Sequence, residues 1–163
     1  MRAQEGPEVL EGMQRALADF RATGSLTFAS FLLSLIAQAE GRFGRYSEAL
    51  AAIGEALRLI EDTGECLFEV EVHRIKGELL LAQNSSAVAE AEESFRTAID
   101  IARRQNAKSW ELRATTSLAR LLRDTNRRDE GRTMLAEIYN WFTEGFDTAD
   151  LKDAKALLDE LAT

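Results

Sequence analysis

Apolar residues recur along most of the chain at intervals of three and four, the spacing that places side chains on one face of an α-helix. One such stripe runs from Phe68 through Ile75 to Ala82, and another runs from Ala49 to Ile60. Only short polar breaks separate the stripes, so neighbouring helices are expected to be antiparallel. The pattern predicts three helix pairs, at 26–43 and 47–63, at 66–83 and 88–105, and at 108–125 and 129–143.

The composition favours the same all-α fold class. Pro7 is the only proline, so nearly the whole chain is free of helix breakers. Alanine, leucine, glutamate and arginine are frequent, and these residues are strong helix formers. Runs of β-branched residues, which would favour strands, are missing.

The polar breaks recur with a regular period. Gly24, Gly64, Asn106 and Gly145 are 40, 42 and 39 residues apart. Glycine and asparagine tolerate the left-handed backbone conformation that ends a helix, so each position is interpreted as the end of one repeat. The period predicts one domain over residues 1–163, divided into a partial repeat at 1–24, repeats at 25–64, 65–106 and 107–145, and a capping helix at 146–163.

Both ends of the chain depart from the paired pattern. Residues 8–22 predict a helix similar to the second helix of a pair, without a first helix before it, and we therefore expect the chain to be the C-terminal part of a larger protein. At the other end, Asp147 is expected to cap the last helix, and Phe146 is expected to pack on Leu151 across that cap. The outer face of this helix is polar, as the end of a stack of repeats requires.

Charge and targeting signals limit the classes of function. The formal charge of −8 argues against a surface built as a whole to hold a polyanion. Residues 96–132 nevertheless contain ten Lys or Arg and only five acids, so a local basic face is compatible with the sequence. Cys66 has no partner for a disulfide, and the chain shows neither a secretory signal nor an apolar stretch of the roughly 20 residues that cross a bilayer. We predict a cytoplasmic protein that does not enter a membrane.

The sequence contains no group of residues typical of a catalytic site, a cofactor site or a metal site. The segment 41–44 contains two glycines but lacks the spacing and the Lys-Ser/Thr of a phosphate-binding loop, so it is interpreted as a turn. His73 and Cys66 are the only residues of their kinds, too few for a transition-metal site or a nucleophile with its base. We therefore expect no enzyme activity, no cofactor and no metal in this region. Three large aromatic residues are interpreted as core packing: Trp110, Trp141 and Phe142.

The predicted pairs resemble tetratricopeptide repeats (TPR), in which small residues on both helices let the backbones approach closely. The chain departs from that pattern in three ways: His73 and Lys76 replace apolar residues, no repeat ends in proline, and each repeat exceeds the usual length of about 34 residues. The resemblance implies a right-handed superhelix of about eight helices. It rests on Leu33, Ile36, Ala37, Ala49, Ile53 and Ala56, on Gly77, Leu80, Ala91, Phe95 and Ala98, and on Leu118, Ala119, Leu122, Gly131, Leu135 and Ile138.

Three segments also resemble the C-terminal tetratricopeptide region of large bacterial signalling proteins. They are HRIKGELLLAQ (73–83), SWELRATTSLARLLRD (109–124) and YNWFTEGFDTADLKDAKALLDEL (139–161). In those proteins this region follows an ATPase of the AAA or STAND kind, itself joined to a class III adenylate cyclase domain or a DNA-binding domain. The resemblance implies a regulatory module for signal transduction or transcription that binds a peptide, a partner domain or upstream domains of its own chain, with no catalysis of its own.

The strongest candidate site is the exposed face of the first helices, which line the concave surface of a helix-pair solenoid. On the third first helix, three arginines and Thr116 follow one another at intervals of 3, 4 and 3, and so share one face. Guanidinium groups along a groove suit carboxylates or a peptide terminus. The alternative is a solvated face with weak internal ion pairs. The predicted partner-binding residues are Arg113, Thr116, Arg120, Arg123, Glu71, Arg74, Glu78, Phe31, Ser34 and Gln38.

Two other functions stay open at this point. The basic segment 96–132 could bind nucleic acid, although no recognised nucleic-acid motif accompanies it. Alternatively, the unpaired helix at 8–22 could associate with a second copy of the chain, because its apolar face lacks the neighbour that a complete pair would provide.

Overall fold

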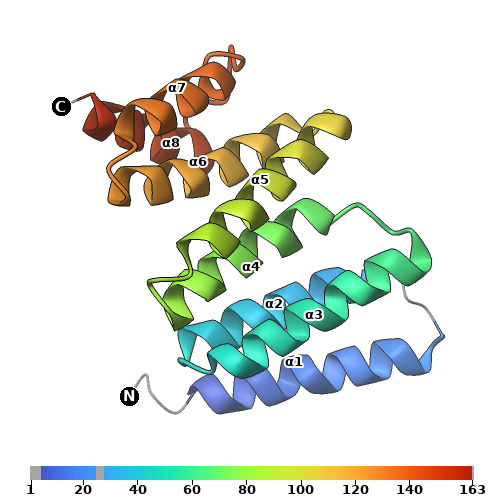
Figure 1. Ribbon diagram of the computed structural model, residues 1–163. Coiled ribbons are helices and arrows are strands. Elements are labelled where there is room, and N and C mark those ends of the chain that lie inside the picture. The colour runs from blue at the N-terminus through green and yellow to red at the C-terminus, as the bar shows by residue number, and fades with distance from the viewer. Residues whose placement is uncertain (1–4, 25–27, 163) are drawn as a thin grey trace.

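The computed structural model describes residues 5–24 and 28–162, with side chains described from residue 8 onward. These residues form eight α-helices and no strand, so the predicted all-α class is confirmed for the described part of the chain (Figure 1). The helices are α1 (Glu5–Ala22), α2 (Ala29–Arg42), α3 (Tyr46–Thr63), α4 (Glu69–Gln83), α5 (Val88–Arg104), α6 (Lys108–Asp124), α7 (Arg128–Tyr139) and α8 (Ala149–Leu161).

The helices contact one another in a regular order. Helices α2 and α3, α4 and α5, and α6 and α7 pack as pairs, and the second helix of each pair contacts the first helix that follows it. The first helices also contact each other, α2 with α4, α4 with α6, and α6 with α8. Figure 1 shows the pairs following one another from α1–α3 at one end to α6–α8 at the other. The first helices therefore form a continuous layer.

Left-handed residues occur at the predicted repeat ends. Helix α3 ends at Thr63, followed by Gly64 with φ 69°, and Asn106 has φ 57° just after α5. Gly145 is also left-handed, with φ 77°, but it does not end a helix. Helix α7 ends at Tyr139, four residues before the predicted end at 143.

Backbone hydrogen bonds between residues three apart explain why α7 ends before residue 143. The amides of Trp141 and Phe142 donate to the carbonyls of Ile138 and Tyr139, each at 3.2 Å. Such tighter turns commonly close a helix. They turn Phe142 back to pack against the cluster formed by α6, α7 and α8, whereas Trp141 is 59% exposed. The core role predicted for Trp141 is therefore wrong.

The start of α8 also differs from the prediction. Thr148, with φ −67° and ψ 152°, occupies the N-cap, one residue after the predicted Asp147. The carbonyl of Gly145 accepts bonds from the amide and the hydroxyl of Thr148, at 2.9 and 2.8 Å, and this closed turn sets where the helix begins. Phe146 lies beside Tyr139, with ring centroids 5.8 Å apart, and is 46% exposed.

Two glycines lie where paired helices approach closely. At Gly77 of α4, an added Cβ would stand 2.5 Å from Cε1 of Phe95 on α5. At Gly131 of α7, it would stand 3.2 Å from the backbone oxygen of Ala119 on α6. Side chains at these two positions would push the paired helices apart.

The apolar face of α1 is covered in part by the helices that follow it. Leu10 and Leu17 are 2% and 7% exposed and pack in the cluster formed with α2, α3 and α4. Arg21 adds an ion pair to Glu55 of α3 at 2.7 Å. These contacts are with helices that follow α1 in the chain, and Val9 stays 57% exposed, so self-association through this helix stays a prediction. Among the described helices, none has the length and apolar character needed to cross a membrane.

Candidate functional site

A polar hollow of about 310 Å³ lies along the first helices. It brings together residues from α2, α4, α6 and α8, most of them charged. Six of the ten residues predicted from the sequence line it, and their role in binding a partner stays a prediction. The lining residues are Gln38, Glu71, Arg74, Arg113, Thr116, Ser117, Arg120, Asp150 and Asp153. We call this cavity the polar hollow.

The three predicted arginines of α6 are held by acids of α8. From the sequence, these guanidinium groups are expected to meet carboxylates of a partner, but the chain provides the carboxylates itself. Acids along α8 form the ion pairs Arg113–Asp150 at 2.7 Å, Arg120–Asp153 at 2.5 Å and Arg123–Glu160 at 3.0 Å. The arginine row therefore helps to dock the last helix.

A buried ion network on α4 forms the wall of the polar hollow. Glu71 and Arg74 are 6% and 9% exposed, and Nε and Nη2 of Arg74 donate to the two Glu71 oxygens at 2.8 and 2.7 Å. Arg74 also donates to Glu78, whose carboxylate accepts a bond from the Ser117 hydroxyl at 3.1 Å. Burial alone would lower the pKa of Arg74, but the hydrogen bonds and charges of Glu71 and Glu78 together raise that pKa above its ordinary value.

Four predicted site residues are held within the fold. Ser34 is fully buried and donates to the carbonyl of Phe31 at 2.7 Å. Thr116, at the edge of the polar hollow, is 4% exposed and donates to a carbonyl of its own helix. The ring of Phe31 stacks on Phe68, with centroids 4.4 Å apart, and Arg123 lies outside the lining of the polar hollow. These four residues contribute to packing and internal pairing.

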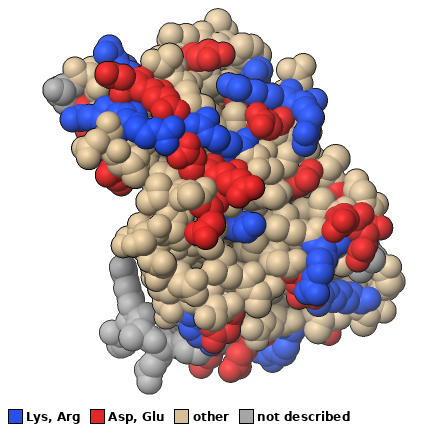
Figure 2. All heavy atoms as spheres, viewed as in Figure 1, with Lys and Arg blue, Asp and Glu red and all other residues tan. Residues whose placement is uncertain are grey.

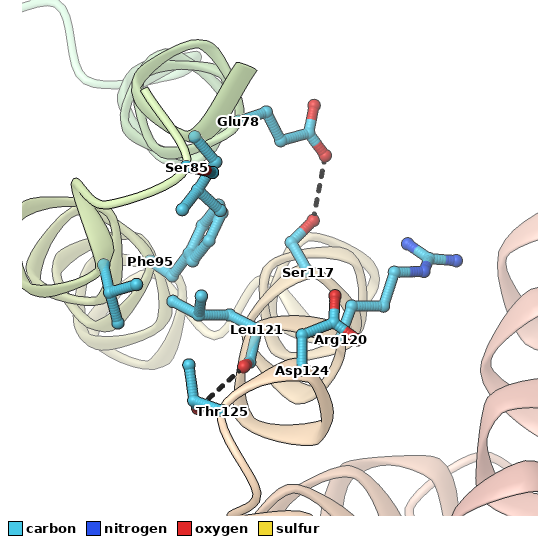
Figure 3. Close-up of a pocket in the computed structure, with 10 residues that line it drawn as sticks. Glu78, Ser85, Phe95, Ser117, Arg120, Leu121, Asp124 and Thr125 are labelled. Carbon is cyan, nitrogen blue, oxygen red and sulfur yellow. Dashed lines mark hydrogen bonds between the residues drawn. The ribbon is translucent and has the colours of Figure 1, made fainter. Parts of the chain in front are cut away.

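A second, half-open hollow of about 500 Å³ adjoins the first (Figure 3). We call it the apolar hollow. Leu81, Val88, Phe95 and Leu121 form its apolar part, and its polar residues are Glu78, Ser85, Ser117, Arg120, Asp124 and Thr125. Ser117 and Arg120 line both hollows, so the two cavities share one border on α6. We call the two together the groove.

The groove carries an excess of negative charge. Its lining contains five acids and three arginines, which is a formal charge of −2. The acids are Glu71, Glu78, Asp124, Asp150 and Asp153, and the arginines are Arg74, Arg113 and Arg120.

The basic segment 96–132 is largely neutralised by neighbouring acids. Seven of its ten Lys and Arg side chains form ion pairs, for example Arg96 with Glu92 and Glu130. Figure 2 shows acidic and basic side chains lying close together over the upper part of the visible face. Paired charges present a weaker positive field to phosphates, so the arrangement lends little support to nucleic-acid binding.

His73 is a partly buried titratable residue whose environment disfavours its charged form. Burial, with a smaller contribution from the charge of Lys76, lowers its pKa from 6.5 to about 4. Its buried Nδ1 has no hydrogen-bond partner among the described residues. Within the described ranges, no three His, Cys, Asp or Glu side chains are grouped as a metal site would require.

We expect the neutral state of His73 to make the fold less stable in mild acid. Because the folded pKa lies below the unfolded value, the unfolded chain binds the proton first, and stability falls as the pH drops from about 6.5 towards 4. At pH 5 the expected loss from this residue is about 2 kcal/mol. Urea unfolding at pH 7 and pH 5 measures it, with His73→Leu as the control for other titrating groups. Equal losses in the two proteins would contradict the assignment.

No protein-family model matches the sequence, and no curated protein shows significant similarity to it.

Proposed function

We propose that the chain is a tetratricopeptide-like module, a right-handed superhelix of helix pairs, that binds a segment or domain of another protein and catalyses no reaction. The order of helix contacts supports this architecture, because first helices meet first helices along the whole layer from α2 to α8. The close approaches at Gly77 and Gly131 support it as well, since they fall at positions where the tetratricopeptide pattern has small residues.

The observation that carries the binding function is the pair of adjoining hollows along α4 and α6. A cavity with apolar walls beside a charged one offers both a place to bury an anchoring side chain and polar groups that fix the orientation of the bound segment. Both hollows are half open to solvent, which suits a segment of another protein better than an enclosed small molecule.

The regulatory part of the proposal rests on the resemblance of residues 73–83, 109–124 and 139–161 to the C-terminal region of bacterial signalling and transcription-regulatory proteins. In that setting the module would dock a partner, or an upstream domain of its own chain, and pass the result to an ATPase. A binding groove is what such a role requires of this region.

Capture from a lysate of the native cell tests the binding function. Ser85 lines the apolar hollow, whereas the neighbouring Ser86 is exposed in the same turn and does not line it. A tryptophan at Ser85 is expected to obstruct part of the hollow, so the pair Ser85→Trp and Ser86→Trp gives a matched comparison. We expect proteins captured by the wild type to be retained by Ser86→Trp and lost by Ser85→Trp. Identical capture by all three proteins would contradict binding at this groove.

A further inference from the structure

At the groove, carboxylates outnumber the arginines that they share, and this sharing determines the charge that a ligand meets. Arg74 serves two carboxylates, those of Glu71 and Glu78. Arg113, the second arginine of the lining, pairs with Asp150 at 2.7 Å and lies 3.7 Å from Glu71. One guanidinium group neutralises only one carboxylate. Here the three carboxylates of Glu71, Glu78 and Asp150 share two guanidinium groups, so this cluster retains a net negative charge.

Arg120, the third arginine that lines the groove, does not make the net charge positive. Arg120 lines both hollows, and its Nη2 lies 2.5 Å from an oxygen of Asp153. It is therefore already neutralised by an acid of α8. Meanwhile Glu78 and Asp124, at the mouth of the apolar hollow, keep 46% and 62% of their side-chain surface exposed. With Arg120, which is paired to Asp153, these two carboxylates are the charged groups that line the apolar hollow.

The inside of the apolar hollow favours an apolar side chain, whereas the acids at its mouth favour a basic one. Phe95 and Leu121 are 1% and 5% exposed and form its deepest part, and the partly buried Leu81 and Val88 complete the walls. Figure 3 shows Phe95 and Leu121 facing this hollow, with Glu78 and Asp124 at its edges. An apolar side chain placed there would remove both itself and these walls from water.

From these charges and walls we propose that the groove binds a partner protein segment in which a bulky apolar residue is flanked by lysine or arginine. The apolar residue enters the hollow, and the basic residues face Glu78 and Asp124. This inference rests on the proposed function and specifies the chemistry of the partner. It departs from the sequence-based expectation of a carboxylate ligand, because the carboxylates for the α6 arginines come from α8.

A library of random twelve-residue peptides displayed on phage tests the proposal with probes of every charge and hydrophobicity. Peptides are selected on the wild type, and those that bind through the hollow are identified by loss of binding to Ser85→Trp and retention on Ser86→Trp. We expect these peptides to carry a net positive charge and a large aliphatic or aromatic residue. Peptides of net negative charge, peptides without such a residue, or a selection that yields no hollow-dependent peptide would each overturn the proposal.

A charge-reversal pair then tests the acidic mouth with the best selected peptide, labelled with fluorescein. Asp124→Lys is expected to weaken binding about fivefold or more, since an exposed ion pair is worth up to roughly that factor and reversal adds repulsion. Glu93→Lys makes the same charge change at an exposed position of α5 that lines neither hollow, and should leave affinity nearly unchanged. Equal effects of the two variants would overturn the role of the mouth.

The outcomes separate this inference from the function it rests on. If selected peptides are acidic but still depend on the hollow, the predicted partner chemistry is wrong and protein binding at the groove stands. If capture from lysate is unaffected by Ser85→Trp, the proposed function itself fails at this site.

Discussion

Arg74→Met is expected to destabilise the fold by about 3–5 kcal/mol, because it leaves the buried Glu71 carboxylate without its main partner. Arg113 cannot replace the lost guanidinium group where it stands, since its Nη1 lies 3.7 Å from Glu71 and its Nη2 is bound to Asp150. The free energy of unfolding from urea titration, followed by circular dichroism at pH 7, measures the change.

The control for this prediction removes the buried charge as well. In the double variant Arg74→Met with Glu71→Gln, no uncompensated carboxylate remains at this position, and we expect at least half of the lost stability to return. A double variant no more stable than Arg74→Met alone would show that the cost comes from lost packing of the arginine stem, and would contradict the electrostatic explanation.

Gly77→Leu is expected to destabilise the fold by about 3 kcal/mol, because its side chain would occupy space that the ring of Phe95 fills. The Phe95 ring is 1% exposed and packs in the core cluster formed by α4, α5 and α6, so displacing it would disturb those contacts. Thermal and urea unfolding of the variant measure the loss. Because the ring also lines the apolar hollow, binding of a selected peptide should weaken in parallel.

Gly54 provides a matched control for that substitution. It lies within α3 with an exposed surface, and an added Cβ would meet nothing within 4 Å. Gly54→Leu should therefore leave stability unchanged or raise it by up to about 1 kcal/mol through better helix propensity. A similar loss at both glycines would mean that the close approach of α4 and α5 does not determine the cost at Gly77.

Much of the fold can be predicted because the period of the apolar pattern is long and regular. The predicted second and third pairs agree with the structure within a few residues at most of their ends, and the left-handed residues Gly64 and Asn106 follow α3 and α5 as expected. The end of α7 differs because Gly145 resembles the other stop signals. The actual end depends on where Phe142 packs, which is a tertiary contact that local spacing does not record.

The candidate site can be predicted only in part. Helical spacing is enough to place Arg113 and Arg120 on one face, because that depends on a single helix. The partners of these arginines depend on how α8 packs against α6 and α7, which is a tertiary contact. Asp150 and Asp153, three residues apart on the predicted capping helix, are a visible signal of a complementary acidic face. Their pairing across helices does not follow from the spacing within either helix.

The apolar hollow escapes prediction for a different reason. Its walls come from the turn between α4 and α5 and from the far half of α6, segments about 35 residues apart. Its members, such as Leu81 and Leu121, follow the ordinary apolar stripes of their helices, so nothing in the sequence distinguishes them from core residues. Only the packed arrangement shows that these stripes leave a cavity between them.

Amide hydrogen exchange on the free and partner-bound protein tests the central claim, binding at the groove, most directly. The strongest partner captured from lysate would be used at saturating concentration. We predict added protection at the end of α4, in the turn at 84–87 and along α6, with little change in α1 and α3. Protection confined to α1 and α3, or no change anywhere in the chain, would contradict binding at the groove.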